Sequence, residues 1–186
     1  MPFGSLWLPV LVSAVVVFIG SSIIHMVLKY HKADIKGLPG EDSIREALGK
    51  ADPPPGIYMT PYCSDMKQMQ DPAMKEKYVK GPVALLTFYP KGGINMGKLL
   101  GLWFAFNILV SFVAAYVARM TLMPGTDGML VMRVTGTVAF AAYGLSHVSD
   151  SIWKGQPWAN TMRALIDTVI YSVLTGLAFC LLWPAA

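Results

Sequence analysis

Four long apolar runs restrict what this chain can fold into. They extend over residues 6–28, 99–118, 128–147 and 164–183, and the only Lys, Arg, Asp or Glu residues in them are Arg133 and Asp167. Each run is close to the roughly 20 residues that an α-helix needs to cross about 30 Å of hydrocarbon. The sequence therefore predicts an all-α membrane protein with four transmembrane helices. A small α+β segment, residues 29–98, connects the first two helices.

The composition agrees with this prediction. Hydrophobic residues make up 54% of the chain and charged residues only 14%, whereas soluble domains carry about a quarter charged residues. The first run could be mistaken for a signal peptide. It has no basic stretch before it and no convincing small-residue cleavage site after it, so we interpret it as an uncleaved anchor.

The basic residues predict the orientation in the membrane. Two of them, Arg119 and Arg133, lie on the side that also carries both termini. On the opposite side, seven lie close to the helix ends, namely Lys29, Lys32, Lys36, Lys91, Lys98, Lys154 and Arg163. The positive-inside rule then places segment 29–98 in the cytoplasm and both termini outside. The net charge of +4 is explained by this topology, so we expect contacts with membrane lipids and not with nucleic acid.

Segment 29–98 contains short elements bounded by prolines. We expect a helix at Glu41–Leu48 and a second helix that Asp71 caps, with Pro72 in its first turn. Residues 57–60 follow a run of prolines and should be extended, paired with a strand in "PVALLTFYP". The apolar content is too small for an independent domain, so we expect this segment to pack against the membrane surface or a partner.

A sulfur-rich stretch, "YCSDMKQMQDPAM", raises the question of a copper site. Cys63, Met66 and Met69 carry ligand types that suit Cu(I). On a helix, steps of three residues would spread their sulfur atoms over about 120°, so they could converge only in a loop. The polar residues between them indicate a solvated surface. We favour packing at an interface over metal binding by these residues.

Polar side chains reach the cytoplasmic leaflet from three predicted helices. An ionisable group inside the bilayer costs about 2.5–3.5 kcal/mol on insertion scales, so it should face the bundle or a partner. We expect Asp167 to face the bundle and to pair with Arg163, four residues before it, or with His147. The cluster consists of His25, His147, Asp150, Arg163 and Asp167. It could be a hydrogen-bonded lock between helices, a site for a quinone, a lipid head group or a proton, or a haem site with His25 and His147 as ligands.

Other features of the predicted helices are those of ordinary packing. Small and weakly polar residues line one face of each of the last three helices and allow close approach. Trp103, Trp153, Trp158 and Trp183 lie near helix ends, where tryptophan anchors are expected. The sequence contains no nucleophile elbow, zinc motif, P-loop or dinucleotide motif. We therefore assign no catalytic residue.

Three stretches carry a resemblance to a known family. They are "SLWLPVLVSAV…SSIIHMVL", "GPVALLTFYPKGGINMGK" and "DSIWKGQPW", and the last is the most specific. Together they resemble a family of bacterial four-helix inner-membrane proteins of unknown function, over most of the chain. The resemblance implies a multi-pass protein of the bacterial inner membrane and assigns no site residue.

Two functional hypotheses follow. The first is a non-catalytic accessory or structural subunit of a larger bacterial membrane complex, for example an energy-transducing one. Its partners would be the other membrane-protein subunits of that complex. The second is a small membrane protein that binds a quinone, a lipid or a haem at the cytoplasmic-leaflet cluster.

Overall fold

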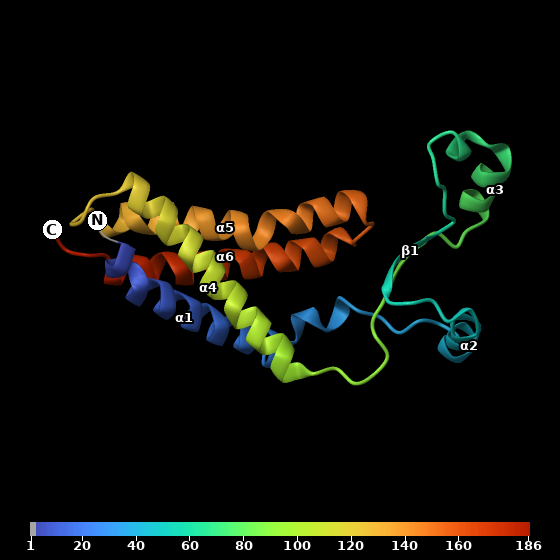
Figure 1. Ribbon diagram of the computed structural model, residues 1–186, viewed down its shortest axis with the longest axis horizontal. Coiled ribbons are helices and arrows are strands. Elements are labelled where there is room, and N and C mark those ends of the chain that lie inside the picture. Colours follow the sequence, from blue (N-terminus) through green and yellow to red (C-terminus); the bar gives the residue numbers. More distant parts are fainter. Residues whose placement is uncertain (1–2) are drawn as a thin grey trace. The chain divides into compact units, whose positions relative to one another are not determined.

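The computed structural model describes residues 3–186, which divide into two units (Figure 1). One unit contains the residues up to 35 together with 95–186, and the other contains residues 36–94. Within the described residues, four helices are long and apolar enough to cross a membrane. All four belong to the first unit, which we call the bundle.

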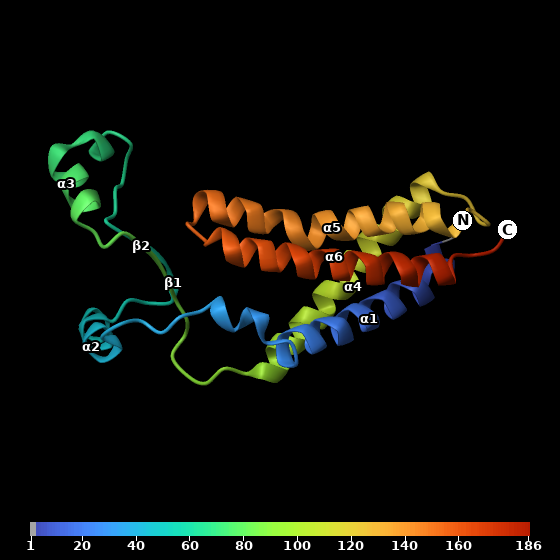
Figure 2. The same ribbon diagram turned by 180° about the vertical axis from the view of Figure 1, so that it is seen from behind.

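The bundle contains α1 (Trp7–Met26), α4 (Met96–Thr121), α5 (Gly128–Trp153) and α6 (Trp158–Leu182). Helix α1 contacts α4 and α6, and α5 contacts the same two helices, so the four helices form a ring. Two short 3₁₀ helices flank α1, namely η1 (Phe3–Leu6) and η2 (Lys29–Ala33). Figures 1 and 2 show that α1 begins and α6 ends at one end of the bundle, whereas η2 and the α5–α6 loop lie at the other.

Side-chain caps fix where two of the helices begin. The Asn95 side chain accepts a hydrogen bond from the Lys98 backbone N–H at 2.9 Å, and Asp127 does the same for Met129 at 3.0 Å. These caps satisfy backbone N–H groups that have no partner within the helix. The α5 helix continues beyond His147 to Trp153, because nothing in the chain interrupts it before Gly155, which adopts a positive φ of +68° in the turn.

Many residues in the bundle interior are small or weakly polar, although Leu6 and Phe179 are also fully buried, and many large apolar side chains face outward. Asn107, Ser111, Ala115 and Ala118 are buried along α4, as the sequence predicts. The α6 helix likewise buries Thr168, Ser172, Thr175 and Gly176. Ser111 donates a hydrogen bond to Ser13 at 3.0 Å, and Tyr143 donates one to Asn107 at 3.1 Å. Close packing and interhelical hydrogen bonds of this kind are typical of helices that associate within lipid.

Segment 36–94 contains the two helices and two strands that its sequence predicts, namely α2 (Glu41–Ala51), β1 (Gly56–Thr60), α3 (Pro72–Lys80) and β2 (Ala84–Phe88). The α2 helix ends three residues later than expected, and a short 3₁₀ helix that the sequence did not predict, η3 (Gln68–Gln70), precedes α3. The two strands pair antiparallel, with Tyr58 opposite Leu86. Asp71 caps α3 by accepting from the Ala73 N–H at 2.9 Å, which confirms the expected N-cap. None of residues 36–94 is buried, so this segment has no hydrophobic core.

Candidate functional site

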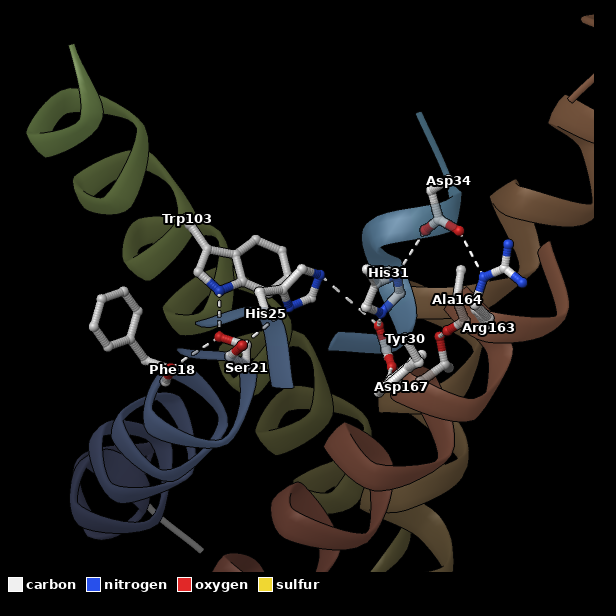
Figure 3. A network of polar contacts seen from close by, with 11 residues as sticks. Phe18, Ser21, His25, Tyr30, His31, Asp34, Trp103, Arg163, Ala164 and Asp167 are labelled. Atoms are coloured by element: carbon white, nitrogen blue, oxygen red, sulfur yellow. Dashed lines mark hydrogen bonds and ion pairs between the residues drawn. The ribbon is translucent and has the colours of Figure 1, made fainter. Parts of the chain in front are cut away.

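Asp167 is the centre of a polar network inside the bundle (Figure 3). It lies in the third turn of α6, and its side chain is only 6% exposed. Tyr30 donates a hydrogen bond to Oδ1 of this carboxylate, and Nε2 of His31 lies 2.8 Å from Oδ2. Both partners come from η2, which follows the end of α1 and contacts α6. The network thus fastens the chain beyond α1 onto α6.

His31 bridges two carboxylates. Its Nε2 contacts Asp167, and its Nδ1 lies 2.6 Å from Oδ2 of Asp34. The other oxygen of Asp34 accepts a hydrogen bond of 2.6 Å from Nε of Arg163, and its backbone carbonyl accepts one of 3.0 Å from Asn160. If both carboxylates are ionised, His31 can satisfy both only as an imidazolium, because a neutral imidazole has one N–H. His31 thus links Asp34 to Asp167 through both of its ring nitrogens.

His25 approaches the same carboxylate from α1. Its Nδ1 lies 2.9 Å from the Ser21 carbonyl oxygen, which can only accept, so Nδ1 carries the hydrogen. Its Nε2 lies 3.9 Å from Oδ2 of Asp167. The His25 and His31 rings are stacked with centroids 4.6 Å apart. Unlike the other members, the His25 side chain is 53% exposed.

Two pKa values of groups outside the four long apolar helices reflect these contacts. Burial raises the pKa of Asp34, but the hydrogen bonds from His31 and Arg163 outweigh it and leave this pKa below its usual value. Asp34 is therefore a carboxylate at neutral pH. Burial raises the pKa of the Tyr30 hydroxyl, and its hydrogen bond to Asp167 raises it further. Tyr30 therefore stays a neutral donor.

A cavity of about 1010 Å³ adjoins the network. Apolar lining comes from Met26 of α1 and from Leu100, Trp103 and Phe106 of α4. The lining also includes three histidines and three aspartates, namely His25, His31, His147, Asp34, Asp150 and Asp167. No lysine or arginine is among its lining residues. The Tyr171 hydroxyl, buried at its wall, has no hydrogen-bond partner among the described residues. The cavity thus joins an apolar surface to an acidic, hydrogen-bonding one.

The structure corrects the expected pairing of Asp167. Arg163 does not pair with it, because the guanidinium turns to Asp34 and also donates to Asn160 at 3.2 Å. His147 lines the cavity, but no hydrogen bond or ion pair joins it to Asp167 among the described residues. Asp150 also lines the cavity and forms an ion pair with Lys154 at 2.7 Å. The five residues singled out in the sequence thus share one region without forming one network.

The remaining candidates occupy different places. Trp103 turns inward, donates to Ser21 at 2.8 Å and lies against the cavity. Trp153 and Trp158 are exposed, and Trp183 donates to the Met123 carbonyl at 3.0 Å. In segment 36–94, Cys63 is half-buried, whereas Met66 and Met69 are 77% and 44% exposed.

Sequence reasoning missed Tyr30, His31 and Asp34. All three fall within residues 29–35, which the basic residues Lys29 and Lys32 assign to the cytoplasmic segment. The structure places this stretch with the bundle. A signal was present in "KYHKAD", where a histidine and an aspartate three residues apart directly follow an apolar helix.

Comparisons of the chain with protein-family models, with curated proteins and with solved structures found no match.

Proposed function

We propose that this chain is a multi-pass membrane protein whose bundle binds a neutral amphiphile, a quinone, in the cavity beside Asp167. The observation that carries the proposal is the composition of the cavity wall. The apolar side chains that α4 supplies suit a ring and tail, and the hydrogen-bonding groups that α5 and α6 supply suit a polar head. The proposed location is the cytoplasmic leaflet of a bacterial inner membrane, with both termini outside.

Charge distinguishes a quinone from an anionic lipid. A phosphate head group would find no lysine or arginine in the wall, and Arg163 and Lys154 already pair with Asp34 and Asp150. It would also meet the carboxylate of Asp167, and like charges in a partly dry site repel strongly. The carbonyl oxygens of a quinone carry no formal charge and accept hydrogen bonds. The imidazole of His147 and the unpartnered Tyr171 hydroxyl can donate such bonds.

A haem between His25 and His147 gains less support. In the structure, the free Nε2 of His25 faces Asp167 and the ring stacks on His31. Axial ligation would remove His25 from both contacts. A quinone requires no such change, because the cavity already exists beside the network.

The experiment fills the cavity without removing a polar group. Ala142 lines the cavity, and its neighbour Ala141 is exposed and does not. We expect protein in nanodiscs to retain a radiolabelled short-chain quinone, Ala142→Trp to lose this binding, and Ala141→Trp to keep it. A short-chain anionic phospholipid should not compete. Competition by that lipid would favour a lipid site, and equal binding by both variants, or none by the natural protein, would overturn the proposal.

We also propose, as a second function, that the protein is an accessory subunit of a larger membrane complex. Segment 36–94 exposes Ile57, Val79 and Tyr89 at 68%, 87% and 83% and has no buried residue of its own. Another subunit could cover these apolar side chains. Purification in a mild detergent followed by native mass measurement tests this proposal. A monomeric mass from native membranes would contradict it.

A further inference from the structure

We infer that His25, His31 and Asp167 form a binding site for a divalent transition-metal ion such as Zn²⁺. One nitrogen of each histidine and one oxygen of the aspartate lie within 4.8 Å of one another. Two imidazoles with one carboxylate are a ligand set that zinc and other first-row divalent metals accept. Metal binding by these groups does not require an amphiphile in the cavity.

The hydrogen bonds behind the three ligands favour coordination. The Nδ1 atom of His25 is bonded to the Ser21 carbonyl, and that of His31 to Asp34. Both imidazoles therefore present Nε2 toward the site (Figure 3). Metal-bound histidines almost always donate their second N–H to a carbonyl or carboxylate, which fixes the tautomer and strengthens the ligand. Tyr30 plays the same part for Asp167, since it occupies Oδ1 and leaves Oδ2 toward the two imidazoles.

The distances require a small rearrangement. Ligand atoms around a tetrahedral Zn²⁺ lie roughly 3.4 Å apart, given bonds of about 2.0–2.2 Å. Oδ2 of Asp167 is now 2.8 Å from His31 and 3.9 Å from His25. One of these separations must therefore widen and the other shorten by about half an ångström, and the two imidazole nitrogens, now within 4.8 Å of each other, must also come to about 3.4 Å. His25 must also turn out of its stack with His31, and its 53% exposed side chain leaves room for this.

The charge around the site also favours a cation. Two carboxylates lie at the two ring nitrogens of His31, Asp34 at Nδ1 and Asp167 at Nε2. A metal ion at Nε2 would bring positive charge directly to the carboxylate of Asp167. Because the cavity adjoins all three ligands, the fourth coordination position would face it. An open position of this kind is typical of metal sites that bind a further molecule.

Cobalt titration tests the site directly, because Co²⁺ in a nitrogen and oxygen environment absorbs visible light. The protein should be purified with a tag other than polyhistidine and treated with a chelator. We expect one Co²⁺ per chain, displaced by Zn²⁺. His25→Ala should weaken binding at least about tenfold, and Asp34→Asn about 10–100-fold, the range for loss of an outer partner.

His147→Ala is the matched control, since His147 lines the same cavity outside the proposed ligand set. It should bind Co²⁺ as the natural protein does. Gel filtration checks that each variant is folded. If His25→Ala does not fold, His25→Gln provides a second substitution at the same ligand. Absence of stoichiometric Co²⁺ binding, unchanged binding by the folded His25 variant, or equal loss in His147→Ala would each overturn the inference.

Discussion

Replacing Asp167 tests the role of the polar network in holding η2 against α6. The carboxylate is 6% exposed and accepts hydrogen bonds from Tyr30 and His31. Asp167→Leu leaves both donors without this acceptor, at about 1–3 kcal/mol for each unsatisfied buried group. His31 retains Asp34, so its share should be small, and we expect a total of about 2–3 kcal/mol, most of it from Tyr30. Asp167→Asn keeps one accepting oxygen and should cost about 1–2 kcal/mol.

The assay is unfolding of the purified protein in mixed micelles, followed by tryptophan fluorescence in the presence of a chelator. Asp150→Leu is the matched control, because Asp150 lines the same cavity but pairs only with the exposed Lys154. It should cost less than about 1 kcal/mol. Tyr30→Phe combined with Asp167→Leu should cost less than the sum of the two single changes, since they share one bond.

Two results would refute this reasoning. One is a free energy of unfolding that Asp167→Leu leaves unchanged. The other is an Asn variant as unstable as the Leu variant, because the shared oxygen would then contribute nothing. If both Asp167 variants kept normal stability while quinone binding disappeared, the carboxylate would serve the ligand and not the fold.

Three further outcomes are expected. Met123→Cys should react with a membrane-impermeant thiol reagent added to intact cells, whereas Cys63 should not, and the reverse pattern would overturn the orientation. Gly144→Ala should destabilise the bundle by about 1–3 kcal/mol, because the new Cβ would lie 2.6 Å from the Thr168 side chain on α6. In the control Gly101→Ala the new Cβ meets nothing within 4 Å, so this change should be neutral or stabilising. Because its native pKa is below the usual 3.8, Asp34 should stabilise the protein above about pH 4 and lose this contribution as the pH falls through the native pKa. Thermal unfolding of Asp34→Asn beside the natural protein would show a difference that disappears in acid, and a difference that persists there would contradict the assignment.

The helices and most short elements could be predicted from local sequence patterns. The four apolar runs predict α1, α4, α5 and α6, and the Asp71–Pro72 pair predicts the start of α3. These features depend on neighbouring residues alone, so a single sequence contains the information. The buried faces of α4 and α6 could also be predicted. On each helix, small residues such as Ser111 or Thr168 are spaced so that they lie on one side, and that side is buried.

The partners inside the site could not be predicted in the same way. Arg163 and Asp167 are four residues apart, which favours a pair along one helix, yet Arg163 contacts Asp34, 129 residues away. Asp34 competes with Asp167 for the Arg163 guanidinium because the fold places η2 beside α6. The local sequence contains no sign of this contact. Because Lys29 and Lys32 are charged, residues 29–35 were predicted to lie in water. His31, between these two lysines, nevertheless turns inward and contacts Asp167. Charge describes a segment on average, whereas the site depends on single side chains.

Photochemical labelling tests the proposed quinone cavity most directly. A photoreactive quinone would be added to the protein in nanodiscs and irradiated, and the labelled residues mapped by peptide mass analysis. We predict labels at the cavity wall, on Met26, Trp103 and Phe106, and their loss in excess unlabelled quinone. Labels spread over outward-facing residues such as Ile19 and Leu109, undiminished by that competitor, would show partition into lipid and contradict the proposal.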